Sequence, residues 1–197
     1  MSLERDIELL YEIGSLRHVP RGWRQHLGMD CSSDLEHTYR VIYLALMLAR
    51  MEGGCDENKI FRMALVHDIP ETRVSDHSYV QKAYVTNIDE EKAAKDMFDR
   101  TSLEDFYETF VSFEDRGSLE AKIVKDADNL DIDIELKELE EQGSQVPRKW
   151  AKNRRMVRDE KLYTESAKKV WDAIEASDPS SWHLAMNKWK TDPTAGK

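Results

Sequence analysis

The segment 33–50 constrains the fold most, because it predicts a helix that is apolar on nearly every side. Ser33 and Glu36 stand at the spacing of a capping box, in which the serine caps the helix and the glutamate reaches back to it. The following stretch, 41–49, reads Val-Ile-Tyr-Leu-Ala-Leu-Met-Leu-Ala and carries no charge. A helix without a polar side is a buried one. We therefore expect a central helix in the core, with His37 in its first turn.

The remainder of the chain predicts an all-α fold. With 197 residues, the chain is most simply one domain, large enough to bury a hydrophobic core. Its eight glycines and five prolines are few, and Val- or Thr-rich alternation typical of strands is missing. We predict a single-domain helical bundle, with a loop and a possible short helix over 72–88 and a disordered tail over 191–197. The other expected helices span residues 3–16, 57–68, 89–100, 102–115, 119–142 and 148–176, with a short last helix that contains Trp182 and Trp189.

Composition limits the partners and the compartment. The net charge of −10 argues against general nucleic-acid binding, which needs a basic surface. No apolar run approaches the roughly 20 residues that span a bilayer, and the charged first residues do not resemble a signal peptide. Two cysteines, Cys31 and Cys55, are too few for a disulfide framework. We expect a soluble cytoplasmic protein with reduced thiols, no membrane contact and no stable nucleic-acid partner.

The apolar helix expected over 57–68 ends in two potential metal ligands, His67 and Asp68. Pro70 disfavours helical geometry at Ile69, so both side chains should lie at the carboxyl end of that helix. Burying an unpaired charge is costly, and a metal ion or an ionic partner is the usual compensation. We interpret this pair as half of a divalent-metal site.

Two more features complete a candidate ligand set: His37 at the start of one apolar helix, and an aspartate cluster over 126–133. Imidazole nitrogen and carboxylate oxygen suit manganese, cobalt, iron, nickel or zinc. A lone histidine is more often a hydrogen-bonded core residue. The ordered combination favours the metal site, but periodicity leaves the choice open among Asp126, Asp128 and Asp131.

This order of residues resembles the HD-domain metal-dependent phosphohydrolases, and most closely the YfbR-like branch that contains 5′-deoxynucleotidases. The resemblance covers about residues 5–175 and rests on Glu36-His37, on the run 65–71 (Leu-Val-His-Asp-Ile-Pro-Glu) and on the run 121–128 (Ala-Lys-Ile-Val-Lys-Asp-Ala-Asp). It implies an HD fold over 1–190, with a core at about 33–142 and C-terminal helices at 148–190. It also implies that one divalent ion is held by His37, His67, Asp68 and, from the family's Lys-x-x-Asp pattern, Asp128.

The same resemblance implies roles in removing phosphate from deoxynucleoside 5′-monophosphates. Asp68 would ligate the metal and steer the attacking water, and Glu71 would act as general acid or position that water. Arg17 would orient the phosphate, and Asp76 would accept a hydrogen bond from the sugar. Two other functions stay open: a phosphodiesterase or nucleoside-triphosphate hydrolase of this superfamily, and a non-catalytic nucleotide-binding regulatory domain.

The chain departs from the branch in the region that would contact the substrate. The branch has Arg-Trp where this chain has Arg17-His18, so we place His18 in the substrate site and ask whether Trp23 supplies the missing indole. The segment 77–80 lacks the branch's proline, and Leu35 replaces a small residue. Base preference and discrimination against ribose therefore stay open.

The C-terminal third has two features with alternative interpretations. The basic stretch 148–169 is either a solvated helix face with internal ion pairs or a surface that attracts anionic substrates. Relatives of the branch commonly form dimers, so we expect a homodimer. The tryptophans at 171, 182 and 189 could contribute to its interface, although such residues more often belong to a core.

Overall fold

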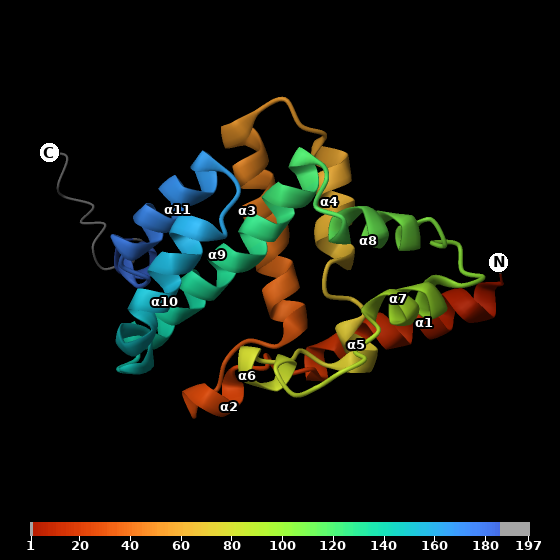
Figure 1. Ribbon diagram of the computed structural model, residues 1–197, viewed down its shortest axis with the longest axis horizontal. Helices are drawn as coiled ribbons and strands as arrows, with labels where there is room; N and C mark the ends of the chain where they lie inside the picture. Colours follow the sequence, from red (N-terminus) through yellow and green to blue (C-terminus); the bar gives the residue numbers. More distant parts are fainter. Residues whose placement is uncertain (1, 186–197) are drawn as a thin grey trace, which may run out of the picture.

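Two long helices form the centre of the fold in the computed structural model, which describes residues 2–185. Helix α3 crosses α9, and both bury apolar residues along their length, among them Val41, Leu48, Ile123 and Leu130 (Figure 1). Helices α4, α8 and α11 pack against this pair. The bounds are α3 Asp34–Glu52, α4 Glu57–Val66, α8 Phe106–Glu114, α9 Leu119–Glu141 and α11 Glu165–Glu175. Among the described residues no strand forms, so the all-α prediction is confirmed.

Shorter helices surround this centre. Helices α1, α5 and α7 lie together on one side, and α10 packs beside α9 on the other (Figure 1). The bounds are α1 Leu3–Ser15, the 3₁₀ turn η1 Leu16–His18, α2 Arg24–Leu27, α5 Glu71–Val74, α6 Tyr79–Lys82, α7 Glu90–Phe98, α10 Val146–Glu160 and α12 Ser181–Ala185. Among the residues described, no helix is both long and apolar enough to cross a membrane. The expected tail at 191–197, and Trp189, lie outside residues 2–185.

The predicted capping box at the start of α3 is present. Ser33 Oγ accepts a hydrogen bond from the backbone of Glu36, and Glu36 Oε2 accepts one from the backbone of Ser33 at 2.7 Å. These bonds satisfy amides that have no partner within the helix. They fix the start of α3 and therefore the position of His37 three residues further on.

The helix predicted over 148–176 is two helices. Helix α10 ends at Glu160, and Thr164 caps α11 by accepting a hydrogen bond from the backbone of Ala167. Asp126 on α9 accepts bonds from the backbone amides of Tyr163 and Thr164, which holds the chain in a non-helical turn between the two helices. The break depends on this distant carboxylate, so local periodicity did not reveal it. The helix expected over 102–115 likewise begins later, at Phe106.

Several apolar side chains of α1 face solvent. Leu3 and Tyr11 are 76% and 78% exposed, whereas Leu9 is buried against a cluster that includes Met97 and Phe98. The guanidinium of Arg5 donates to the backbone carbonyl of Met97 at 3.1 Å, which fixes this face of α1 toward α7. The helix is present as predicted, and it packs through the face that holds Leu9.

Candidate metal centre

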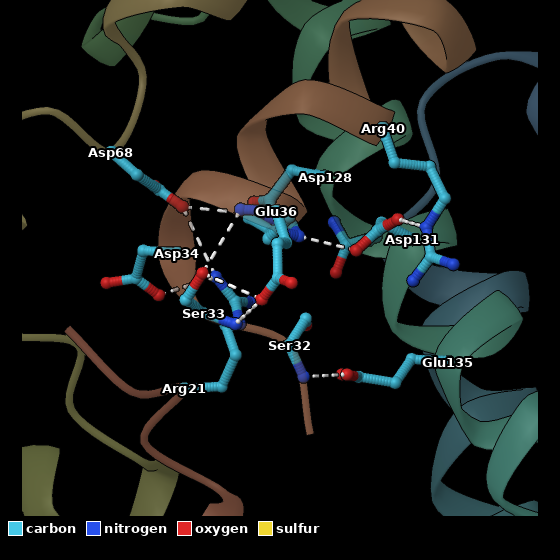
Figure 2. Close-up of polar contacts among 12 residues, drawn as sticks. Arg21, Ser32, Ser33, Asp34, Glu36, Arg40, Asp68, Asp128, Asp131 and Glu135 are labelled. Atoms are coloured by element: carbon cyan, nitrogen blue, oxygen red, sulfur yellow. Dashed lines mark hydrogen bonds and ion pairs between the residues drawn. The ribbon is translucent and has the colours of Figure 1, made fainter. Parts of the chain in front are cut away.

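Four side chains from three parts of the chain converge at the buried centre. His37 comes from α3, His67 and Asp68 follow the end of α4, and Asp128 comes from α9. His37 Nε2 lies 3.3 Å from Asp68 Oδ2 and 3.2 Å from Asp128 Oδ1. His67 Nε2 lies 3.2 Å from Asp68 Oδ2 and 3.4 Å from His37 Nε2. Figure 2 shows Asp68 and Asp128 pointing toward this common point.

The donor set fits a divalent metal ion. Ligands bound at about 2.1 Å to one ion lie roughly 3.0–3.4 Å from each other in octahedral or tetrahedral geometry, which matches these separations. The other nitrogen of each ring has its own partner: His37 Nδ1 lies 2.6 Å from Asp131 Oδ2, and His67 Nδ1 lies 2.9 Å from the carbonyl of Ala64. A protonated Nδ1 leaves the lone pair of Nε2 free to face the ion.

The two carboxylates of the cluster are ionised. Burial raises the pKa of Asp128, but the ammonium of Lys125 and, in the metal-free protein, the protonated ring of His37 more than offset it and hold this pKa well below its usual range. Lys125 Nζ lies 2.6 Å from Asp128 Oδ2. For Asp68, burial is likewise overcome by His67 and His37, so its pKa is also held well below its usual range. Both groups are therefore competent ligands.

Arg21 contacts three carboxylate groups in and beside the metal cluster. Its Nη1 is 3.4 Å from Asp34 Oδ1 and 3.4 Å from Asp68 Oδ2, and its Nε is 3.5 Å from Asp76 Oδ2. The backbone amide of Gly22 donates to the same Asp76 oxygen at 2.9 Å. A Cβ at Gly22 would come within 2.6 Å of the backbone nitrogen of Ser78, so only glycine lets the two loops approach this closely.

Glu71 is the buried carboxyl group beside the cluster. Its residue is 8% exposed, and its Oε2 is buried without a hydrogen-bond partner among the described atoms. Burial, followed by the charges of Asp68, Asp76 and Asp34, raises the pKa of Glu71 to about 12. In the metal-free protein this shift favours the carboxylic acid form of Glu71, which has a proton to donate.

A cavity of about 570 Å³ is lined by Arg21, Asp68, Glu71, Asp76 and Asp128. Two indole rings, Trp23 and Trp150, also line it and are stacked with centroids 5.9 Å apart and planes 25° from parallel. The expected basic stretch contributes Lys149 and Arg154 to the lining. Arg154 is neutralised by a buried ion pair with Asp133, in which two nitrogens contact the two carboxylate oxygens at 2.7 and 2.8 Å.

The structure brings together most of the residues singled out in the sequence, with two exceptions. Arg17 and His18 are exposed, do not line the cavity and contact each other, with Arg17 Nε 3.0 Å from His18 Nε2. Arg21 lies in the cavity instead. Of the alternative late aspartates, Asp128 joins the cluster, Asp131 lies behind His37, and Asp126 caps the turn before α11.

Sequence reasoning missed Arg21 and Asp34. Arg21 belongs to a connector that also holds Arg17, and no local pattern distinguishes the two guanidinium groups. Asp34 sits inside the capping box, where an acidic residue is ordinary, yet it is fully buried. The one local signal for Arg21 is the adjacent Gly22, which permits close approach of another loop.

The chain belongs to the HD domain family, because a sequence profile of that family matches residues 13–171. The family resemblance predicted from the sequence is therefore confirmed. A 5′-deoxynucleotidase HDDC2 from Danio rerio is 27% identical over 147 residues, which cover 71% of this chain and 72% of that protein.

Solved structures share the fold. A conserved hypothetical protein from Pyrococcus furiosus is 27% identical, with a TM-score of 0.72 over 87% of this chain and 99% of that chain. A predicted metal-dependent phosphohydrolase from Magnetospirillum magnetotacticum is 20% identical, with a TM-score of 0.68 over 87% and 92% of the two chains. At that identity the second likeness concerns the fold alone.

Proposed function

We propose that this protein is a divalent-metal-dependent phosphomonoesterase that acts on deoxynucleoside 5′-monophosphates. The observation that carries the proposal is the cluster of His37, His67, Asp68 and Asp128, whose two carboxylates line a cavity together with Arg21 and the buried carboxyl group of Glu71. A metal site, a cation for the phosphate and an acid for the leaving oxygen are the parts that phosphate-ester hydrolysis needs. The curated relatives that bear the name 5′-deoxynucleotidase support the substrate class.

When bound, the metal ion would neutralise phosphate oxygens and lower the pKa of a coordinated water. The four ligands named above would hold it, and one ion of manganese, cobalt, iron, nickel or zinc suits their nitrogen and oxygen atoms. Asp68 uses Oδ2 toward both histidines, which leaves Oδ1 to accept a hydrogen bond from the attacking water. The guanidinium of Arg21 orients the phosphate, the role that the family resemblance implied for Arg17.

Glu71 donates its proton to the 5′ oxygen of the sugar as that oxygen leaves phosphorus. An alkoxide is a poor leaving group, so protonation in the transition state contributes typically 10²–10⁴-fold to the rate. Asp76 accepts a hydrogen bond from a sugar hydroxyl with the oxygen that Arg21 and Gly22 do not use. The stacked pair Trp23 and Trp150 contacts the nucleoside.

Three finer predictions accompany this function. The protein acts in the cytoplasm, it forms a homodimer, and its domain extends over residues 1–190. They rest on the composition of the chain and on the family resemblance.

A phosphate-release screen tests the proposed function. The protein is freed of metal, reloaded separately with Mn²⁺, Co²⁺ or Zn²⁺, and incubated with ribo- and deoxynucleoside 5′-monophosphates, a nucleoside triphosphate and a cyclic nucleotide. We expect inorganic phosphate from the deoxynucleoside monophosphates. Pyrophosphate from the triphosphate, or opening of the cyclic ester, would indicate the alternative superfamily chemistries. Tight nucleotide binding without any turnover would indicate the regulatory domain.

A further inference from the structure

Asp34 is a buried carboxyl group to which neither the metal cluster nor the proposed reaction gives a role. It lies in the first turn of α3 and is 0% exposed. One of its oxygens, Oδ1, lies 3.4 Å from Arg21 Nη1. The other, Oδ2, is buried and has no hydrogen-bond partner among the described atoms. Leaving a buried carboxylate oxygen without a partner is costly, so this atom needs an explanation.

A second buried oxygen without a hydrogen-bond partner belongs to Glu71, beside Asp34. Glu71 Oε2 also has no hydrogen-bond donor, and Asp34, Glu71 and Asp76 each offer an oxygen within 4.8 Å of those of the other two. Two carboxylates cannot bond to each other, because both only accept hydrogen bonds. One proton placed between them turns one partner into a donor and satisfies both buried oxygens together.

We propose that Asp34 is a positioning residue for Glu71: the two side chains share one proton in a carboxyl–carboxylate hydrogen bond that aims the acid at the leaving oxygen. This proposal rests on the proposed phosphomonoesterase function. The charged groups on the neighbouring elements favour a single proton shared by Asp34 and Glu71. Asp68 at the end of α4 and Asp76 in the loop before α6 disfavour a second negative charge, while Arg21 stabilises the one that remains.

The pair gives the proposed reaction a balanced proton path. As the bond between phosphorus and the 5′ oxygen breaks, its electron pair stays on that oxygen, which takes the proton of Glu71. The attacking water forms the new bond to phosphorus and releases one proton, which returns to the carboxyl pair through solvent. The products are the deoxynucleoside and inorganic phosphate, and Asp34 and Glu71 again share one proton. Asp34 itself touches neither substrate nor metal.

The sharpest test compares two leaving groups in the Mn²⁺-loaded protein. One substrate is a deoxynucleoside 5′-monophosphate, and the other is its analogue with sulfur in place of the bridging 5′ oxygen. A thiolate leaves without a proton, so it does not need an acid. Asp34→Asn replaces the oxygen that would share the proton with an amide that donates to Glu71, so the acid is no longer aimed at the leaving oxygen. We expect kcat for the oxygen ester to fall about 10²-fold, as for loss of a general acid, while kcat for the sulfur analogue stays nearly unchanged.

Asp76→Asn is the matched control. It removes another carboxylate from the same guanidinium, at 3.5 Å, without touching either buried oxygen that lacks a partner. It should lower turnover of the two substrates by the same factor. Glu71→Gln should reproduce the selective loss, and Asp34→Asn combined with Glu71→Gln should be no slower than Glu71→Gln alone. Equal losses on both substrates in Asp34→Asn would overturn the proposal.

Two further measurements keep the proposal testable if Asp34→Asn does not fold or if the protein releases no phosphate. Infrared difference spectra between wild type and Glu71→Gln should show the C=O stretch of a protonated carboxyl group at neutral pH, and its absence would contradict the shared proton. Elemental analysis should find one Mn²⁺ per chain in both wild type and Asp34→Asn. Two ions in wild type and one in the variant would mean that the three carboxylates bind a second cation instead.

Discussion

Asp131 Oδ2 lies 2.6 Å from Nδ1 of His37, on the side of the imidazole ring that faces away from the ligand cluster. The same carboxylate also pairs with the guanidinium of Arg40 (Figure 2). Arg40 Nη1 in turn contacts Glu138 at 2.9 Å. This series of polar contacts, from His37 through Asp131 and Arg40 to Glu138, therefore fixes the orientation of the His37 ring. A carboxylate behind a ligating histidine raises the basicity of the ring and selects its tautomer.

Asp131→Asn should weaken metal binding without removing a ligand. Loss of such a partner typically costs about 10–100-fold in metal affinity, and we expect a decrease in this range in a titration of Mn²⁺ against a competing chelator. Glu138→Gln is the control, because it disturbs Arg40 and leaves the bond from His37 to Asp131 in place. An affinity in Asp131→Asn equal to that of wild type would contradict the role of His37 as a ligand.

Metal removal should lower the melting temperature of wild type. An ion present at 100 times its dissociation constant stabilises the native state by about 2.7 kcal/mol, which corresponds to roughly 5–10 °C for a chain of this size. In His67→Ala the melting temperature should be the same with and without metal. Calorimetry of both proteins before and after chelation measures the two differences. A metal-dependent rise that persists in His67→Ala would place the ion elsewhere.

Asp126→Ala should destabilise the fold without changing the turnover of the folded protein. Asp126 accepts bonds from Tyr163 N at 2.7 Å, Thr164 N at 2.9 Å and Thr164 Oγ1 at 2.8 Å. Loss of these bonds should reduce the free energy of unfolding by about 2–4 kcal/mol. Asp126→Asn, which keeps one acceptor oxygen, should lose less. Denaturant titration gives the free energies, and turnover per folded molecule should stay at the wild-type value in both variants.

The four proposed ligand residues could be predicted from the sequence. His37, His67 and Asp68 stand where an apolar helix begins or ends, and the family resemblance selected Asp128 among the aspartates of α9. Arg21 could not, because its distinction from Arg17 depends on contact between two loops, through Gly22 and Ser78, that only the folded chain brings together. The break between α10 and α11 is another tertiary effect, imposed by Asp126 from α9. Local sequence pattern predicted the helices, whereas the boundary between α10 and α11 depends on long-range hydrogen bonds to Asp126.

Glu71→Gln should stabilise the metal-free protein more as the pH rises. The pKa of Glu71 is raised by burial to about 12, so above its ordinary value of about 4.5 the unfolded chain loses a proton that the native state keeps. The native state then binds more protons, and stability decreases with increasing pH. Glutamine carries no such penalty. The difference in melting temperature, Glu71→Gln minus wild type, should increase by at least roughly 2–4 °C from pH 5 to pH 8, the equivalent of about 1 kcal/mol. A difference independent of pH would mean that Glu71 is ionised in the native state.

The most direct measurement is phosphate release from a deoxynucleoside 5′-monophosphate by the Mn²⁺-loaded wild type and by His67→Ala, run side by side with elemental analysis of both. The account predicts phosphate release and one bound ion per chain in wild type, and loss of both in the variant. Wild type that holds the ion and releases no phosphate would contradict the proposed activity. A variant that keeps both ion and turnover would contradict the metal centre itself.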